Sequence, residues 1–219
     1  MESYDRAALL LLARLDSRRL PGKGLLDLNG RPVLGRTIDR LRRCREVSRI
    51  VLATSNRPVD DDLASFARAE GIECFRGDAH DVASRCLAAA QHLGLDWFIR
   101  ICGDSPFVPP DLVDDVARAF LEGACDLASN VYPRSYPVGA SAEAISRAAM
   151  ERICRSTDDM AFLEHVTLYA YEHPDAFSIV GVAPENGEYG EVSIAVDTQD
   201  ELERARWITG QTSAPEELG

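Results

Sequence analysis

The sequence predicts an α/β protein with a mostly parallel central sheet flanked by helices. Short apolar runs alternate along the chain with longer segments whose apolar residues recur every three to four positions, which is the pattern of a doubly wound sheet. The 219 residues are enough to bury a large core. Their content of 46% hydrophobic and 27% charged residues is that of an ordinary globular protein rather than a disordered one.

Strands and helices alternate regularly in the first half of the chain. Apolar runs predict strands over residues 7–13, 49–53, 73–75, 97–102 and 126–131. Helical periodicity predicts helices over residues 32–44, 60–70, 81–93 and 110–122. This order favours parallel strands joined by helical crossovers.

The second half is less regular. Residues 132–145 are rich in Pro, Gly and small side chains, and helical stretches follow near 147–155 and 159–172. Two further strands, 178–183 and 192–195, are expected to pair at the far edge of the sheet.

The end of the chain carries a helix-start signal. The sequence TQDE at 198–201 has the spacing of a capping box, so a last helix is expected directly after Asp197. No linker divides the chain, which predicts a single domain over residues 1–211 and a frayed tail over 212–219.

Charge and composition exclude several classes of partner. With 24 basic and 36 acidic residues the formal charge is −12, which repels nucleic acid and anionic membranes, so a polyanionic ligand needs a local basic patch. The longest apolar run, Ala7 to Ala13, is too short to span a membrane and lacks the basic flank of a signal peptide. The six cysteines form no C-x-x-C pair, which favours reduced thiols and a cytoplasmic location.

A basic loop follows the first predicted strand. Ligands of open α/β sheets bind beyond the carboxyl ends of the strands, and the loop Arg14 to Gly24 lies there. Its glycines allow close backbone approach to an anion such as a triphosphate, and its cations supply charge: Arg14, Arg18, Arg19 and Lys23. The loop matches no Walker A motif, and a solvated basic loop is the alternative.

Two aspartates end predicted strands. Asp104 follows the strand over 97–102, and Asp197 follows the strand over 192–195. Carboxylates at this edge could ligate a magnesium ion that serves a nucleotide. An Asx turn or a helix start is the alternative for each.

Three further side chains have two interpretations each. Arg100 interrupts an apolar strand, where it either contacts a phosphate or Asp104, or forms a structural salt bridge. Arg85 either reaches a ribose or phosphate or lies on a solvated helix face. His165 either contacts a substrate or is an ordinary histidine of the core or helix surface.

Four stretches together resemble the cytidylyltransferase superfamily. They are ARLDSRRLPGK (13–23), RGDAHDVASR (76–85), RICGDSPFV (100–108) and VDTQDEL (196–202), with weaker additions at 129–139 and 163–171. The resemblance is closest to the spore coat polysaccharide biosynthesis (SpsF-like) branch, related to CMP-KDO and CMP-acylneuraminate synthetases.

The resemblance implies a GT-A-like nucleotidyltransferase fold, CTP as donor and Mg²⁺ as the metal. It implies transfer of CMP to a sugar acid or similar anionic acceptor, and a homodimer. Catalytic roles fall to Lys23, Arg14 and Asp104, and metal binding to Asp104 and Asp197. The implied nucleotide contacts are Leu12, Ala13, Arg14, Ser17, Arg18, Arg19, Gly22, Lys23, Arg85, Arg100 and Gly103. The implied acceptor contacts are Tyr136, Gly139, Glu143, Glu164 and His165.

Two positions depart from the family pattern. Leu12 stands where the family often has Gln, and Ser141 stands where relatives commonly have an acid. The second departure bears on the acceptor and leaves the phosphate-binding residues intact. The competing hypotheses are a nucleotidyltransferase of the same fold acting on a phosphonate or sugar phosphate, and a non-catalytic nucleotide-binding protein.

Overall fold

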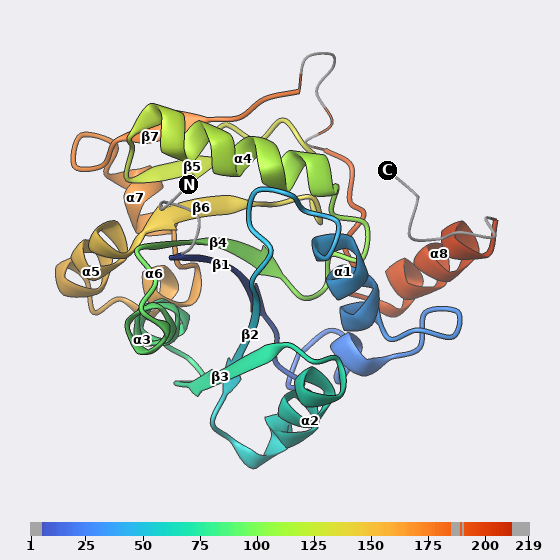
Figure 1. Ribbon diagram of the computed structural model, residues 1–219. Coiled ribbons are helices and arrows are strands. Elements are labelled where there is room, and N and C mark those ends of the chain that lie inside the picture. Colours follow the sequence, from blue (N-terminus) through green and yellow to red (C-terminus); the bar gives the residue numbers. More distant parts are fainter. Residues whose placement is uncertain (1–5, 185–188, 190, 212–219) are drawn as a thin grey trace.

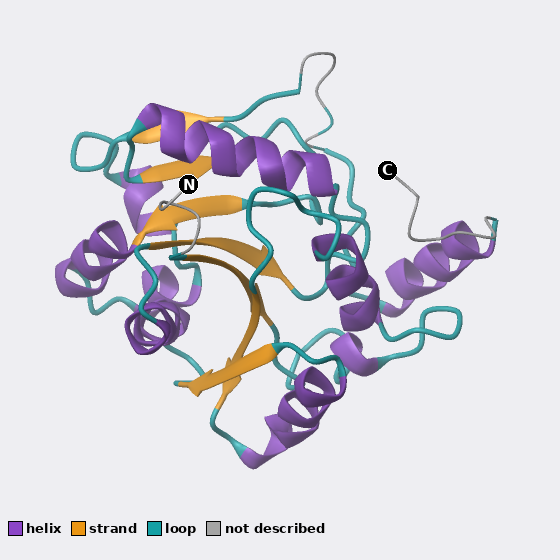
Figure 2. Cartoon of the chain, viewed as in Figure 1, coloured by secondary structure: helices purple, strands orange, loops and turns teal. Residues whose placement is uncertain are grey.

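A seven-stranded sheet with helices on both faces forms the centre of the molecule (Figure 1 and Figure 2). The computed structural model describes residues 6–184, 189 and 191–211, so the predicted tail over 212–219 lies outside the described residues. The strand order is β3-β2-β1-β4-β6-β5-β7. The strands are β1 Ala7–Leu12, β2 Ile50–Ser55, β3 Glu73–Gly77, β4 Trp97–Cys102, β5 Leu127–Ser129, β6 Glu143–Ser146 and β7 Ile179–Gly181.

The sheet is mostly parallel, as the sequence predicts. Strand β1 pairs in parallel with β2 on one side and with β4 on the other, and β2 pairs in parallel with β3. Strand β6 runs antiparallel to both of its neighbours, β4 and β5. The carboxyl ends of β1 and β4 therefore meet at one edge, with Leu12 paired to Cys102.

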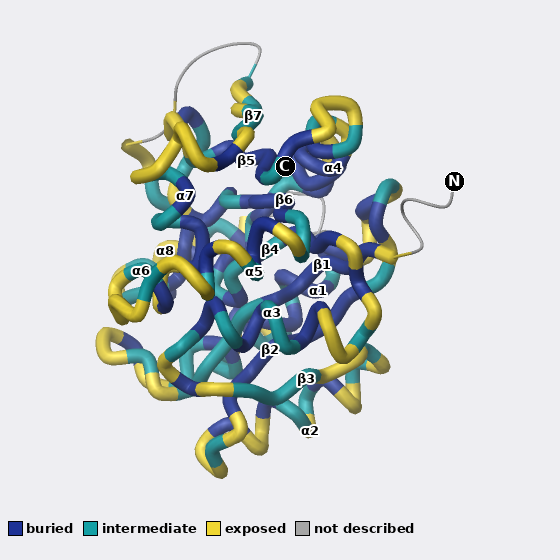
Figure 3. The backbone as a smooth tube through the Cα atoms, turned by 90° about the vertical axis from the view of Figure 1, so that its left-hand side faces the viewer, coloured by how far each residue is buried: buried dark blue, intermediate teal, exposed yellow. Residues whose placement is uncertain are grey.

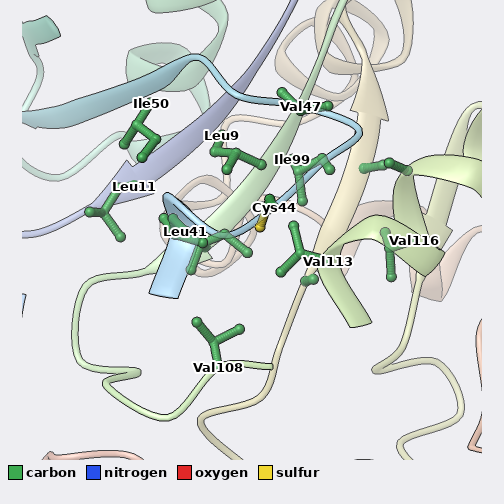
Figure 4. Packing of buried hydrophobic residues seen from close by; sticks show 14 of the residues in the cluster. Leu9, Leu11, Leu41, Cys44, Val47, Ile50, Ile99, Val108, Val113 and Val116 are labelled. Carbon is green, nitrogen blue, oxygen red and sulfur yellow. The ribbon is translucent and has the colours of Figure 1, made fainter. Parts of the chain in front are cut away.

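Helices divide between the two faces according to the alternation of the strands. In β1, Leu9 and Leu11 belong to the hydrophobic cluster under α1, α2 and α4, part of which Figure 4 shows. The intervening Ala8 and Leu10 belong to the cluster under α3, α5, α6 and α7. The helices are α1 Val33–Leu41, α2 Asp61–Ala69, α3 Val82–Leu93, α4 Pro110–Gly123, α5 Arg147–Ser156, α6 Met160–Glu164, α7 Leu168–Glu172 and α8 Gln199–Gly210.

Both faces of the central strands are thus covered, which explains their continuous apolar sequence. In Figure 3 the buried backbone of β1, β4 and β6 lies inside a shell of exposed loops. A third, smaller cluster joins the basic loop to α8 through Leu20, Val196 and Leu202.

The prediction for the last helix is confirmed. Helix α8 begins at Gln199, and Thr198 caps it by accepting a hydrogen bond from the Glu201 backbone N–H. The Glu201 carboxylate accepts in turn from the Asp197 backbone N–H at 2.8 Å. This reciprocal pairing satisfies donors that would otherwise lack partners at the helix start.

In the second half, one predicted helical stretch is divided and one predicted strand is wrong. The stretch 159–172 forms two short helices, because the chain turns at residues 165–167 and directs the Thr167 hydroxyl onto the buried Glu143 carboxylate. Residues 192–195 form no strand, and only one bridge joins Ser193 to Val138. The pairing does not extend, because Gly139 leaves the extended conformation with a φ of +96° and the next N–H, that of Ala140, donates to the Pro137 carbonyl at 3.0 Å.

The observed ends of several other elements differ by a few residues from the predicted ones. The strand predicted over 126–131 covers only β5, and the one predicted over 178–183 covers only β7. Strand β6 begins inside the segment 132–145 that the sequence leaves irregular, and extends one residue beyond it. Among the described residues, no helix combines the length and apolar character that a membrane crossing requires. All six cysteines carry free thiols.

Candidate active site

Lys23 lies between two aspartates that are distant in the sequence. Its ammonium donates to the Asp104 carboxylate at 2.5 Å and also to the Asp197 carboxylate. The three side chains are between 16% and 21% exposed, so solvent screens these contacts only partly. The predicted convergence of the basic loop with both acids is confirmed, while their catalytic roles stay predictions.

Gly103 allows Asp104 to reach this position. Its backbone N–H donates to the Leu12 carbonyl at 2.8 Å, which ties the loop after β4 to the end of β1. A Cβ atom at Gly103 would lie 3.0 Å from both the Leu12 carbonyl oxygen and the Ala13 side chain. The two strand ends can approach this closely because position 103 has no side chain.

Asp197 is fixed by hydrogen bonds on both sides. The Val196 N–H donates to the Asp104 carbonyl at 2.9 Å, and the Asp197 N–H is held by Glu201 of α8. The two aspartates are therefore linked through the backbone as well as through Lys23.

Electrostatics favour the charged forms of Lys23 and Asp197. Burial lowers the pKa of Lys23, but Asp104 and Asp197 outweigh it and the net shift is upward. Burial raises the pKa of Asp197, yet the hydrogen bond and charge of Lys23, together with Arg19 at 2.7 Å, lower it overall. A cation already lies between the two carboxylates, so the site stabilises positive charge at that point.

The basic loop is held in a defined shape. The Leu15 N–H donates at 2.7 Å to the fully buried Asp60 carboxylate, which also accepts from the Ser55 hydroxyl. Gly22 turns the chain with a φ of +72°. Arg14 donates to the Ala79 carbonyl and lies 3.6 Å from Glu164. Of the four cations of the loop, only Arg18 and Arg19 are exposed as a solvated loop would have them.

A first cavity of about 470 Å³ opens beside this loop. All of the predicted nucleotide contacts line it except Gly22, whose contribution is the turn. Glu164 and both aspartates also line it. Gly24 of the basic loop lines it as well, while the sequence reasoning did not single out four other lining residues, which are Asp16, His80, Val82 and Cys102.

Arg85 is buried, which overturns the interpretation that favours a solvated helix face. It is 2% exposed, lines the first cavity and donates to the Asp78 carbonyl at 2.6 Å. Among the described residues, its Nε has no hydrogen-bond partner and no carboxylate pairs with it. Burial lowers the pKa of this guanidinium. Burial of an unpaired charge is costly, so an anion in the cavity would stabilise it.

Of the two interpretations of Arg100, the structure shows the structural salt bridge. Arg100 pairs with Glu143, which is 1% exposed and also accepts hydrogen bonds from the hydroxyls of Thr167, at 2.7 Å, and Tyr171. Burial raises the pKa of Glu143, but Arg100 and these donors lower it overall. Because its oxygens are already occupied, Glu143 supports Arg100 rather than contacting an acceptor directly.

A second cavity of about 490 Å³ adjoins the first. Both are lined by Arg100, Cys102, Asp104, His165 and Asp197, so the two cavities meet at the aspartates. Of the predicted acceptor contacts, Gly139, Glu143 and His165 line this cavity, Glu164 lines only the first, and Tyr136 packs against the main core instead.

His165 is exposed at the end of α6, so it is not a core histidine. The sequence reasoning did not single out Ser105, Arg134, Thr167 and Tyr171 of the second cavity. Thr167 and Tyr171 lie within the stretch 163–171 that carries part of the resemblance, and this was the available signal.

Comparison with known proteins identifies the family. The model of the cytidylyltransferase family matches residues 8–205. The chain belongs to this family. This cytidylyltransferase is therefore an enzyme, a nucleotidyltransferase that uses CTP.

Two relatives cover most of this cytidylyltransferase. It is 29% identical over 201 residues to the spore coat polysaccharide biosynthesis protein SpsF of Bacillus subtilis, which is 89% of this chain and 82% of SpsF. A solved cytidylyltransferase from Leptospira borgpetersenii superimposes with a TM-score of 0.92 and 25% identity, covering 96% of this chain and 89% of that one.

A more distant structure shows the shared fold alone. The CMP:2-keto-3-deoxy-manno-octonic acid synthetase, solved with CTP, superimposes with a TM-score of 0.71 and 20% identity, over 94% of this chain and 99% of that one. The nucleotidyltransferase fold expected from the sequence is confirmed.

Proposed function

We propose that this cytidylyltransferase transfers CMP from CTP to a sugar acid or similar anionic acceptor and releases pyrophosphate in a Mg²⁺-dependent reaction. The observation that carries the proposal is the junction of two cavities of similar volume at Asp104, Asp197 and Arg100. Two substrates that must react with each other need two adjoining sites, and a protein that only binds a nucleotide needs one.

The first cavity has the charge distribution that CTP requires. Cations line it at both ends of the loop, with Lys23 and Arg19 beside the aspartates and Arg14 and Arg85 near residues 78–80. A triphosphate complements several guanidinium and ammonium groups at once. Arg85, buried without a carboxylate partner, supports an anionic ligand more directly than the exposed Arg18 does.

The donor set fits Mg²⁺. This ion is typically held by one or two carboxylates together with substrate phosphates, so Asp104 and Asp197 suffice. The described residues contain no cluster of three or more His, Cys, Asp or Glu side chains suited to a metal, in agreement with a site completed by the nucleotide. When bound there, Mg²⁺ would neutralise charge on the phosphate oxygens.

The protein itself contributes positioning and charge. An acceptor oxygen attacks the α-phosphorus, a new oxygen–phosphorus bond forms, the bond to the bridging oxygen breaks, and its electron pair leaves with pyrophosphate. Lys23 and Arg14 stabilise the negative charge that grows on the leaving group. Such a transfer needs no covalent nucleophile on the protein, because alignment of the reactants supplies most of the rate.

The acceptor class rests on the relatives and on the second cavity. Both SpsF and the synthetase are named for saccharide chemistry, and the cavity of about 490 Å³ is lined by hydroxyl groups of Ser105, Ser141, Thr167 and Tyr171. A phosphonate or sugar phosphate as acceptor is the alternative of the same fold. We further propose a homodimer and a cytoplasmic location, as the sequence predicts.

A screen of pyrophosphate release tests the proposal. The enzyme is incubated with each of the four nucleoside triphosphates and Mg²⁺ against sugar acids, sugar phosphates and phosphonates. Release with CTP and a sugar acid is expected. CTP binding without release from any acceptor would favour the non-catalytic alternative, and release with another triphosphate would contradict the choice of base.

A further inference from the structure

The second cavity contains one positive charge that the described residues leave uncompensated. Three acids line it, and each is paired: Asp104 with Lys23 at 2.5 Å, Asp197 with Lys23 and Arg19, and Glu143 with Arg100. The remaining charged side chain of the lining is Arg134.

Arg134 interacts with a neutral group instead of an acid. Its guanidinium donates to the Ser141 hydroxyl at 3.3 Å, and no carboxylate lies within 4.0 Å of it in the described parts of the chain. A guanidinium has five N–H donors in a rigid fork, so one contact to a hydroxyl leaves most of them available.

Backbone contacts on the N-terminal side of Ser141 fix the position of this residue. Ser141 follows Gly139, whose φ is +96° and where a Cβ atom would lie 2.4 Å from the Ala195 nitrogen. The Val138 N–H donates to the Val192 carbonyl at 2.8 Å, and the Ile194 N–H returns a bond to Val138 at 2.7 Å. The segment that carries Ser141 is therefore packed against the segment that leads to Asp197.

We propose that Arg134 and Ser141 form a subsite for an anionic group of the acceptor, a carboxylate, phosphate or phosphonate. The inference rests on the proposed function, because the acceptor is the occupant of the second cavity. Two N–H groups of the fork match two oxygens of such an anion, and the Ser141 hydroxyl can donate to it once the anion replaces it on Arg134. Arg134 is exposed, so water solvates its charge while the cavity is empty; an anionic acceptor replaces that water with a charged partner and a neutral acceptor does not, so the subsite selects for charge.

The test uses four variants of the full chain. Arg134→Gln removes the charge, Arg134→Lys keeps the charge but loses the fork, and Ser141→Asp supplies an internal carboxylate that competes for Arg134. Arg155→Gln is the matched control, since Arg155 is an exposed arginine of α5 that lines neither cavity. The probes are 3-deoxy-manno-octulosonate, N-acetylneuraminate, glucose 1-phosphate, 2-aminoethylphosphonate and neutral glucose.

Steady-state rates with the best acceptor form the first measurement. Loss of one charge-assisted contact should raise the acceptor KM about ten- to a hundredfold in Arg134→Gln and leave the KM for CTP unchanged. Arg134→Lys should show a smaller rise, and Ser141→Asp a rise in the same direction. An unchanged acceptor KM in Arg134→Gln, or a neutral best acceptor, overturns the subsite.

Thermal shift of the enzyme by each probe without CTP forms the second measurement. An anionic probe should raise Tm in the wild type and in Arg155→Gln but not in Arg134→Gln. The Tm measurement does not depend on turnover. If no transfer reaction is detected but an anionic probe still raises Tm through Arg134, the proposed function is rejected and the subsite is retained. If no anionic probe raises Tm, or if one does so equally in Arg134→Gln, the subsite is rejected. The probe that raises Tm most identifies the class of anion.

Discussion

Replacement of Glu143 by Gln tests whether the buried pair with Arg100 holds the junction of the two cavities. Gln has nearly the same shape, and its carbonyl oxygen can still accept from Thr167 and Tyr171, which both donate to one oxygen of Glu143. The other oxygen pairs with Arg100 and would become an amide group that cannot accept a hydrogen bond. The substitution therefore removes the counter-charge and little else.

The expected loss of stability is large. The side chains of Arg100 and Glu143 are 18% and 2% exposed, so water can replace the lost partner only in part. Removal of one member of a buried ion pair costs about 3–5 kcal/mol. For a chain of this size each kcal/mol lowers Tm by about 2–4 °C, so Tm should fall by roughly 6–20 °C.

Urea and thermal unfolding of Glu143→Gln, with Glu172→Gln as control, measure this loss. Glu172 is an exposed glutamate of α7 and should tolerate the change within about 0.5 kcal/mol. The double variant Arg100→Met/Glu143→Gln should be more stable than the single variant, because both charges are then removed. A single variant as stable as the wild type would refute the assignment of Glu143 as the support of Arg100.

Three further predictions concern the aspartates and the loops around them. Lys23→Ala should lower kcat/KM for CTP by about ten- to a few-hundredfold, and Asp104→Ala by more, because the latter removes a proposed metal ligand. Pyrophosphate release measures both, and equal effects would contradict the proposed metal role of Asp104. The low pKa of Asp197 keeps it ionised below the usual 3.8, so its contribution is complete above that pH and is lost only as pH falls through the lowered value. Lys23→Ala removes the largest cause of that lowering, so the acid limb of the pH–rate profile should move to higher pH, and an unmoved limb would assign it to another group. Gly139→Ala should cost about 2–5 kcal/mol in urea unfolding, because it adds a left-handed strain and a clash with the Ala195 backbone. Gly30→Ala is the matched control, with a φ of +82° and no atom within 4 Å of the new methyl group, and should cost only about 1–2 kcal/mol; equal losses would show that the clash contributes nothing.

The first half of the fold could be predicted because local pattern and tertiary burial agree there. Strand β4 occupies the predicted residues 97–102, and α3 matches the prediction 81–93 within one residue, with Gly94 ending the helix in a left-handed conformation. Both signals depend only on neighbours in the sequence.

Strand β6 and the break between α6 and α7 could not be predicted in this way. Residues 143–146 form a strand because β4 and β5 lie on either side of them, and their four letters carry no alternation. The turn at 165–167 exists because Thr167 and Tyr171 reach Glu143 from another segment. Each depends on a partner distant in the sequence.

The residues of the candidate site also differ in whether local sequence pattern could identify them. Asp104 could be found because it follows β4 at the edge of the parallel sheet, and Lys23 because it lies in the basic loop after β1. The reasoning from a strand end is wrong for Asp197, because the strand predicted before it does not form. The roles of Arg85 and Arg134 could not be decided from the sequence. The role of Arg85 depends on its burial, and that of Arg134 on the absence of a nearby acid among the described residues. Neither property is visible in one sequence.

The tie between Val196 and Asp104 has a consequence for synthesis of the protein. Residues 97–104 leave the ribosome about ninety residues before Asp197. A nascent chain that has already paired β1, β2, β3 and β4 holds Lys23 beside a single carboxylate. Only translation of the segment that carries Asp197, directly before α8, supplies the second acid, so ribosome-bound intermediates that lack this segment are expected to be catalytically silent.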